Sequence, residues 1–410
     1  MRPRLPRAPT RPLRFGEFVA LMALMFSTIA FSIDAMLPAL PVMAQDLSPD
    51  APNLVQLVVT IFVLGMGTGT LFAGPISDAL GRRRVVAAGI VLYAIGAVVA
   101  ARAQTLEMLL AARFVQGLGA AGPRVVTVAM VRDLYKGRAM AQVMSFVMTV
   151  FILVPAIAPA IGAGIIAVFD WRAVFLSFVV FGVVSGGWML MRQPETLPPE
   201  RRRPLRIATL HAALREVLSD RMVLTYIAAL SLGFGQMFAY LSSAPQIFAE
   251  VYDRQASFPF WFAGVALFAG TASLVNARLV MRLGMRRLAT AAFAVQATAS
   301  AAMLVLLTMA LPTPGDFAVF FAYMCVAFFM IGLTFGNLNA LALETMGHIA
   351  GLAAAVVGAV STMLAVVIAI PIGLLYDGTP VPVVAGVAVC SSLAFLLMLS
   401  TRRAARAIGE

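Results

Sequence analysis

The sequence is poor in the side chains on which most soluble enzymes depend. Only 12% of its 410 residues are charged, and it contains two histidines and two cysteines. Cys325 and Cys390 lie inside apolar runs, where we expect them to be small buried hydrophobic side chains. His211 and His348 are near polar segments without an HExxH pattern or an acidic metal cluster, so an integral membrane enzyme is disfavoured. A sensor or receptor is also disfavoured, because the chain has no sizeable soluble domain.

Hydrophobic residues make up 61% of the chain, and the mean hydropathy is +0.95. A soluble protein needs more polar residues to cover its surface. Apolar stretches of about 20 residues recur along the chain, each long enough to cross a bilayer as a helix. The sequence therefore predicts an all-α polytopic membrane protein with twelve transmembrane helices. We place them at residues 17–40, 54–76, 85–103, 106–131, 139–165, 172–191, 222–246, 258–281, 288–310, 317–342, 350–376 and 381–401.

Basic residues gather on one side of this topology. With the N-terminus in the cytoplasm, the inner segments hold 25 of the 30 lysines and arginines, and the outer loops hold Arg102, Arg172 and Arg254. This bias follows the positive-inside rule and predicts cytoplasmic N- and C-termini. The basic charge thus lies along the inner leaflet, and we expect no nucleic-acid partner. The basic N-terminal segment precedes a run that is too long for a cleaved signal peptide.

The spans form two halves that repeat in parallel. We divide the chain into an N-terminal six-helix bundle (1–192), a cytoplasmic linker (193–221) and a C-terminal six-helix bundle (222–410). Gly81 and Gly284 each occur in a Leu-Gly turn with nearby arginines, and they are 203 residues apart. The first and seventh spans begin at nearly the same offset. Such repeats are typical of secondary transporters, with a substrate site between the halves at mid-membrane. In the linker, residues 207–218 predict an amphipathic helix on the inner interface.

Asp34 is the only acidic residue well inside a predicted span. Arg113 lies at a similar depth in the fourth span, and Arg124 lies on the same face, since eleven residues at 100° come to 20° past three turns. A buried carboxylate is costly unless it is protonated, paired or facing water. Asp34 therefore either forms a structural ion pair with Arg113, reaches the outer headgroups, or exchanges a proton. Arg124 either faces a polar cavity or snorkels to the inner interface.

The fifth span carries Pro155 and Pro159, which remove backbone donors, and Gly162, which permits close helix packing. We expect a kinked helix at a packing seam that flexes. The eleventh span repeats this pattern less densely, with Pro371 and Gly373.

Several motifs together resemble the major facilitator superfamily, and within it the Bcr/CflA type of drug:proton antiporter. GPISDALGRRRVV, residues 74–86, is similar to the superfamily's loop signature between the second and third helices. ARFVQGLGAAG, residues 112–122, resembles its fourth-helix signature. VPAIAPAIGAG occupies the place of the fifth-helix antiporter signature, and SIDAMLPALP is similar to the first-helix Bcr/CflA stretch. The loop signature is matched at Gly74, Asp78, Gly81, Arg82 and Arg83, with Ala79 in place of an arginine.

The resemblance implies proton-driven export, by alternating access, of amphiphilic drugs of the bicyclomycin, chloramphenicol or sulphonamide sort. We expect a monomer in the bacterial inner membrane whose partners are protons, lipid and a small-molecule substrate, with no cofactor beyond the proton gradient and no metal. Export of a cell-made sugar, purine, amino acid or siderophore remains an alternative. Asp34 would carry the proton and Arg113 would tune it. The expected substrate-binding residues are Phe31, Asp34, Leu37, Gln116, Gln236, Tyr240, Asn337 and Asn339.

Gating is expected at the loop signature, at Arg124 and at Pro155, Pro159 and Gly162. Gly74 and Gly81 would allow a tight bend held in the cytoplasm by Arg82 and Arg83. Asp78 would meet the positive N-terminus of the eleventh helix, near residues 347–351, when the transporter is open to the outside.

Overall fold

The computed structural model describes residues 13–309 and 316–408, and it is almost entirely helical. The N-terminal half contains α1 (Phe15–Asp34), η1 (Leu37–Ala39), α2 (Leu40–Leu47), η2 (Pro52–Gln56), α3 (Leu57–Leu80), α4 (Arg82–Ala101), α5 (Leu106–Leu134), α6 (Gly137–Val168) and α7 (Trp171–Arg192). The linker contains η3 (Pro199–Arg201) and α8 (Ile207–Ser219). The remaining elements are α9 (Arg221–Gln246), η4 (Ile247–Val251), α10 (Phe258–Gly270), α11 (Ala272–Leu283), α12 (Met285–Thr308), α13 (Asp316–Leu343), η5 (Gly347–Ile349), α14 (Ala350–Leu374) and α15 (Val381–Ile408).

Twelve helical stretches within the described residues are long and apolar enough to cross a membrane, as the sequence predicts. Three of them differ from a simple straight helix. The first breaks after Asp34 and continues as η1 and α2, the seventh ends in the π-helical η4, and the eighth is divided into α10 and α11. The fifth, by contrast, stays one helix, α6, through both of its prolines.

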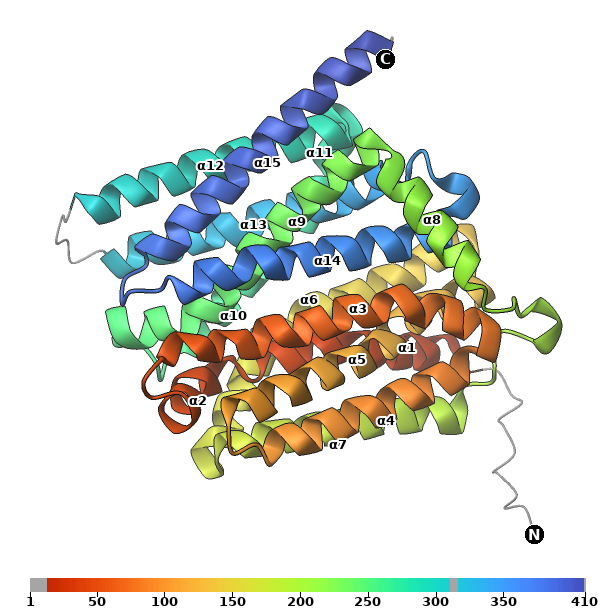
Figure 1. The fold of residues 1–410 in the computed structure, drawn as a ribbon, viewed down its shortest axis with the longest axis horizontal. Helices are drawn as coiled ribbons and strands as arrows, with labels where there is room; N and C mark the ends of the chain where they lie inside the picture. The colour runs from red at the N-terminus through yellow and green to blue at the C-terminus, as the bar shows by residue number, and fades with distance from the viewer. Residues whose placement is uncertain (1–12, 310–315, 409–410) are drawn as a thin grey trace.

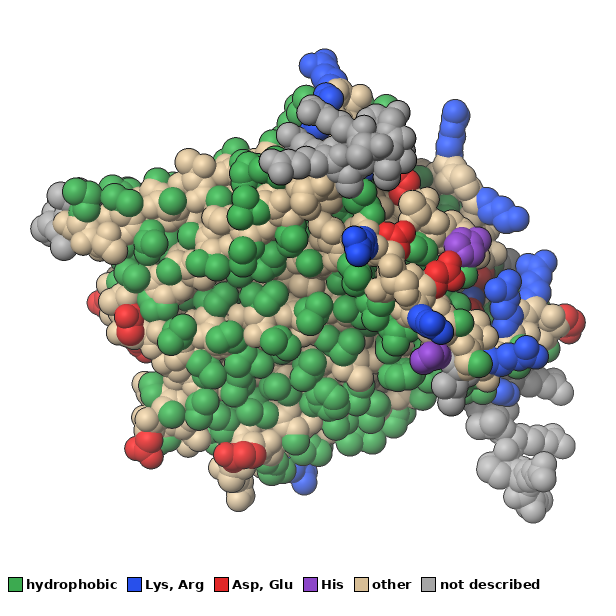
Figure 2. Space-filling view, turned by 45° about the horizontal axis from the view of Figure 1, so that its top comes forward, with side chains coloured by type: hydrophobic (Ala, Val, Ile, Leu, Met, Phe, Trp, Pro, Cys, Tyr) green, Lys and Arg blue, Asp and Glu red, His purple; other side chains and the backbone are tan. Residues whose placement is uncertain are grey.

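The helices run side by side between two ends of the bundle (Figure 1). We call the end that carries α8 the linker end; α1 begins there and α15 finishes there. Lysine and arginine side chains gather at this end, and a broad hydrophobic band separates it from the opposite end (Figure 2). This distribution is the one that the positive-inside pattern predicts.

Two glycines turn the chain at equivalent places in the two halves. Gly81 separates α3 from α4 with φ 98° and ψ 154°, and Gly284 separates α11 from α12 with φ 78° and ψ 155°. Side chains with a Cβ rarely adopt this backbone conformation, so glycine is favoured at both turns. The matched geometry supports the internal repeat inferred from sequence.

The packing between the halves differs at the two ends. The main seams are α3 against α14 and α6 against α10. Toward the end opposite the linker, Leu37, Val59, Tyr240 and Val366 belong to one apolar core that both halves share. Toward the linker end, separate cores form in the C-terminal half and in the N-terminal half. The halves are therefore joined more closely at the opposite end.

The amphipathic helix of the linker forms as predicted, but its apolar face packs on protein. Val217 is fully buried in the core that α9 and α14 form at the linker end, and Ala213 is 3% exposed. His348 Nε2 lies 2.7 Å from Glu216 Oε1 and ties α8 to η5. The expectation that the apolar face of this helix lies on the membrane interface is thus wrong, because that face packs on the C-terminal half. His211 is exposed, as expected.

Candidate functional site

Asp34 lies where the first transmembrane stretch stops being helical. It is the last residue of α1, and Pro38 and Pro41 follow at the starts of η1 and α2. Proline lacks the N–H that would continue the helical hydrogen bonds, so the two prolines favour a break here. Asp34 is only 4% exposed, and among the described residues no hydrogen bond or ion pair reaches its carboxylate. The structure thus buries an acidic group without a partner inside a span.

Arg113 on α5 is fully buried and joins three helices. Its Nε donates to the carbonyl of Val58 on α3 at 3.1 Å, and its Nη2 donates to the carbonyl of Ser32 on α1 at 3.2 Å. Its Nη1 donates to Gln116 Oε1 at 2.8 Å, and the guanidinium carbon lies 4.2 Å from the centre of the Phe62 ring. A cation near the carbonyls that end α1 is favourable, because the helix dipole is negative there.

Asp34 and Arg113 therefore do not form the ion pair that was one alternative from sequence. Arg113 holds the backbone two residues before Asp34, and Ser32 is also fixed through its hydroxyl, which lies 2.6 Å from the hydroxyl of Tyr93 on α4. The sequence shows that both charges lie at one depth, but it cannot show that backbone carbonyls satisfy the arginine.

The other predicted binding residues of the N-terminal half lie near the break after Asp34, but most of them pack against other side chains. Phe31 stacks on Phe181 of α7 with ring centres 4.7 Å apart, and Leu37 is fully buried in the shared core. Gln116 is fully buried, and its Nε2 has no hydrogen-bond partner within the described residues. Since Oε1 accepts from Arg113, Nε2 is the donor end of this amide.

In the C-terminal half, Gln236 and Tyr240 of α9 are both buried on one helical face. Gln236 Oε1 and the Tyr240 hydroxyl lack partners among the described residues. The Tyr240 ring is 5.8 Å from Phe328 and 6.1 Å from Phe320. An apolar aromatic surface with unpaired polar atoms is suited to an amphiphilic ligand.

Asn337 and Asn339 of α13 do not come together. Asn337 Nδ2 donates to Asn276 Oδ1 on α11 at 2.7 Å, whereas Asn339 Nδ2 donates to the carbonyl of Phe335 on its own helix at 2.9 Å. Residues two apart on a helix point about 200° apart, so only one can face a given cavity. Asn337 contributes to packing between helices in this state.

A buried amide cluster joins the halves at the end opposite the linker, and sequence reasoning missed it. Gln56 Nε2 donates to Gln246 Oε1 at 2.7 Å. The hydroxyls of Ser243 and Ser242 donate to Gln56 Oε1 at 2.8 and 3.3 Å. The only sequence signal is the occurrence of glutamines at the limits of the second and seventh spans.

Neighbouring residues extend this junction toward α14. Asn53 Nδ2 donates to the carbonyl of Tyr376 at 2.5 Å, and a Cβ on Gly373 would meet Gln56. Burial raises the pKa of Tyr376, as does the nearby Glu250 carboxylate, so this phenol stays neutral.

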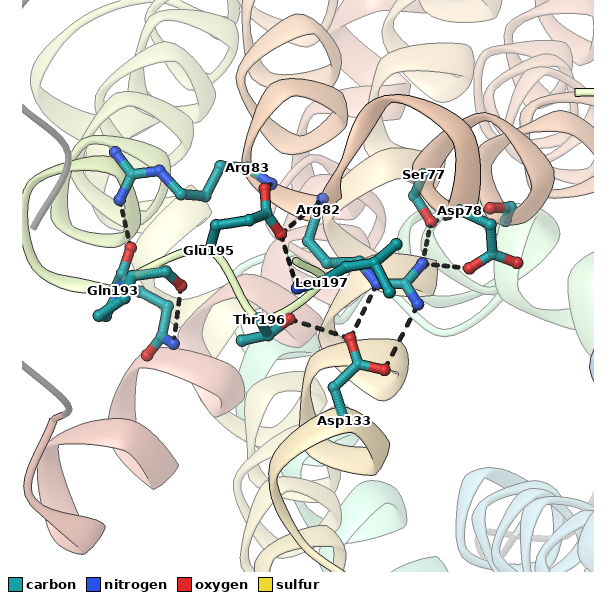
Figure 3. A network of polar contacts seen from close by, with 11 residues as sticks. Ser77, Asp78, Arg82, Arg83, Asp133, Gln193, Glu195, Thr196 and Leu197 are labelled. Atoms are coloured by element: carbon teal, nitrogen blue, oxygen red, sulfur yellow. Dashed lines mark hydrogen bonds and ion pairs between the residues drawn. The ribbon is translucent and has the colours of Figure 1, made fainter. Parts of the chain in front are cut away.

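At the linker end, the loop signature forms a network with other residues of the N-terminal half and with the start of the linker (Figure 3). Arg82 is 2% exposed and contacts Asp78 at 2.5 Å and Ser77 at 2.6 Å through Nη1. Its Nε donates to Asp133 of α5 at 2.9 Å, and Asp133 also accepts from Thr196. A nearly buried arginine is thus held between two carboxylates.

Glu195 of the linker caps α4, a role that sequence reasoning missed. Its Oε1 accepts from the backbone N–H of Arg82 at 3.0 Å, and its Oε2 accepts from that of Arg83 at 3.2 Å. A carboxylate at a helix N-terminus satisfies free donors and complements the dipole. Arg83 donates in turn to the carbonyls of Gln193 and Leu190.

The remaining gating residues occupy different surroundings. Gly162 of α6 packs directly on the carbonyl of Ala35, so a Cβ there would overlap it, and Pro159 is buried while Pro155 is half-buried. On α3, Gly74 faces Val125 more loosely. Arg124 is half-buried, and its Nη1 lies 3.9 Å from Met66 Sδ.

Comparison with known proteins shows which family has this architecture. The family model described as Major Facilitator Superfamily matches residues 21–371. The chain belongs to the major facilitator superfamily. Membership of this transporter superfamily makes it a transporter rather than an enzyme. The D-xylose-proton symporter has the same fold, with a TM-score of 0.72 and 17% identity over 93% of this chain and 97% of that one.

Two bacterial relatives of this superfamily member cover most of the sequence. An uncharacterized MFS-type transporter of Bacillus subtilis (strain 168), YdgK, is 31% identical over 387 residues, which are 90% of this chain and 92% of that protein. The bicyclomycin resistance protein homolog of Haemophilus influenzae is 30% identical over 347 residues, covering 84% and 85% of the two chains.

Proposed function

We propose that this transporter exports drug-like amphiphilic compounds in exchange for protons. It would act as a monomer without a cofactor in the bacterial inner membrane, with both termini and the linker end in the cytoplasm. The name of the Haemophilus relative supports a drug as cargo, and the buried Asp34 supports proton coupling. Export of a cell-made metabolite would use the same fold and is a separate outcome of the tests below.

The unpaired burial of Asp34 is the observation that carries the proposal. A carboxylate that lacks a partner inside a membrane span costs several kcal/mol unless it is protonated or meets water. The neutral acid therefore suits a state in which the site is closed, and release of the proton requires a state in which water or a substrate donor reaches it. This requirement couples the proton to alternating access.

Arg113 acts as a positioning residue in this proposal. It binds the Ser32 carbonyl, and Tyr93 binds the Ser32 hydroxyl, so the end of α1 is fixed from α4 and α5. Because carbonyls already satisfy the guanidinium, Asp34 remains available for a proton. Protonation would then change the charge of the site without breaking an ion pair.

During transport, the contact between the halves at one end would open while the contact at the other end closes. In this structure the halves share the Gln56 cluster at the end opposite the linker, which we assign to the outer side. Opening outward requires this cluster to separate and the linker end to close. Asp78 now pairs with Arg82, and its expected contact with the start of α14 belongs to that other state. The contact between Asp78 and the start of α14 stays a prediction.

The substrate would lie between Asp34 and the aromatic surface around Tyr240. Gln116 offers an unpaired donor from one half, and Gln236 and Tyr240 offer polar atoms from the other. Phe31, Leu37 and Asn339 would border this space, and Asn337 would join it if its bond to Asn276 opened. The apolar rings would hold the body of the compound.

Resistance profiling in an efflux-deficient bacterial host tests the function. The wild-type transporter should raise the inhibitory concentration of several amphiphilic antibiotics, and Asp34→Asn should abolish the effect at equal expression. Glu107→Gln is the matched control, since Glu107 is an exposed acid in the first turn of α5. No change in any drug's inhibitory concentration would argue against drug export and in favour of a metabolite cargo.

A further inference from the structure

Arg124 is a cation inside a span, and it forms no ion pair with any residue that the structure describes. It lies on α5, ten residues before the end of that helix at Leu134, or about 15 Å from it. Its Nη1 lies 3.9 Å from Met66 Sδ, and a thioether is a weak acceptor that carries no charge. Arg113, on the same helical face, is by contrast fully satisfied by two carbonyls and an amide oxygen.

Arg124 begins a stripe that leads to the linker end. Val128 and Arg132 follow at four-residue spacing, so the three side chains lie along one face of α5. Val128 is 37% exposed, and Arg132 is exposed. Nη1 of Arg132 lies 3.5 Å from where a Cβ would be on Gly351, at the start of α14. The linker end of the stripe therefore lies next to the C-terminal half.

Within the described part of the chain, no acidic side chain forms an ion pair with this stripe. All six acidic residues of the C-terminal half lie outside its six predicted spans. Asp133, next to Arg132 in sequence, lies about 100° around α5 from it and is bound by Arg82 and Thr196. Among the described residues, neither Arg124 nor Arg132 takes part in an ion pair.

From this arrangement we infer that Arg132 and Arg124 form an anion-binding path that admits the acidic group of a substrate from the linker end. This inference rests on the proposed function, whose cargo it narrows to amphiphiles that carry a sulfonate, carboxylate or ionised sulphonamide. Arg132 attracts the anion at the mouth, and Arg124 binds it about 12 Å deeper. A guanidinium offers paired N–H donors that match the oxygens of such groups.

Two dyes with one skeleton test the inference. 8-Anilinonaphthalene-1-sulfonate carries the anion, and N-phenyl-1-naphthylamine is the same ring system without it. Binding of each dye to the purified transporter in phosphatidylcholine nanodiscs is measured by fluorescence, with empty nanodiscs subtracted. The variants are Arg124→Gln, Arg124→Lys and Arg132→Gln. Arg84→Gln is the control, because Arg84 is exposed at the same end but lies on α4.

We expect Arg124→Gln to weaken sulfonate binding by about tenfold, as loss of a charge-assisted hydrogen bond should. Arg132→Gln should weaken it less, and Arg124→Lys and Arg84→Gln should stay within about threefold of wild type. The neutral dye should bind all five proteins equally.

The inference is overturned if wild type binds the sulfonate no more tightly than the neutral dye, or if Arg124→Gln changes both dyes alike. If Arg124→Gln does not fold, Arg132→Gln decides, since its side chain is exposed: unchanged sulfonate binding overturns the inference. The assay needs no proton gradient. Failure of drug–proton exchange would therefore appear separately and would leave this result interpretable.

Discussion

The buried amide cluster around Gln56 should determine how often the transporter opens at the end opposite the linker. Gln56→Leu removes three buried hydrogen bonds that join η2, directly before α3, to α9 and leaves Gln246 Oε1 without its donor. A buried hydrogen bond contributes about 1 kcal/mol. We therefore expect the closed state to lose about 3 kcal/mol relative to the outward-open state, which is about 100-fold in the ratio of the two populations.

Double electron–electron resonance measures this shift directly. Spin labels at Arg102→Cys and Met309→Cys report the separation of the halves, because both residues are exposed at that end. The background first needs Cys325→Ala and Cys390→Ala, which remove the only native thiols. Gln56→Leu should add a population at longer distance that is minor in the parent protein.

A second variant separates the hydrogen bonds from the shape of the side chain. Gln56→Glu keeps the acceptors for Ser242 and Ser243 but loses the donor to Gln246, so we expect it to favour the open state as well. Gln296→Leu is the control, since Gln296 is buried in α12 and takes no part in this junction. An unchanged distance distribution in Gln56→Leu would refute the assignment of this cluster as the junction.

Two further predictions concern packing and capping. Gly162→Ala places a methyl group against the Ala35 carbonyl and should lower stability by about 1–3 kcal/mol, whereas Gly164→Ala, where the space is open, should change it by less than about 0.5 kcal/mol. Thermal unfolding in detergent compares the two, and equal midpoints would contradict the close contact. Glu195→Ala removes the cap of α4 and should cost about 1–2 kcal/mol in the same assay. The exposed Glu200→Ala is its control, and a similar loss in both variants would argue against the cap.

The sequence predicts the twelve spans because the membrane demands long apolar helices, and that signal is local. It also predicts the turns at Gly81 and Gly284, where a repeated motif meets a backbone conformation that suits glycine. The break after Asp34 was missed, although Pro38 and Pro41 mark it, since an apolar run continues through them.

Side-chain partners were harder to predict, since they depend on how helices are rotated against one another. The charges of Asp34 and Arg113 were placed at the same depth, yet Arg113 binds carbonyls. Asn337 was expected at the substrate, yet Asn276 from the neighbouring helix binds it. Glu195 reaches α4 across more than a hundred residues, a distance at which spacing carries no information.

Proton movement through purified transporter in proteoliposomes tests the central proposal most directly. A pH-sensitive dye in the lumen reports proton flux when a drug identified by resistance profiling is added, for wild type, Asp34→Asn and the control Glu107→Gln. The proposal predicts drug-dependent flux in wild type and Glu107→Gln, and none in Asp34→Asn, although that variant still binds the drug. Undiminished drug-coupled flux in Asp34→Asn would contradict the assignment of the proton to Asp34.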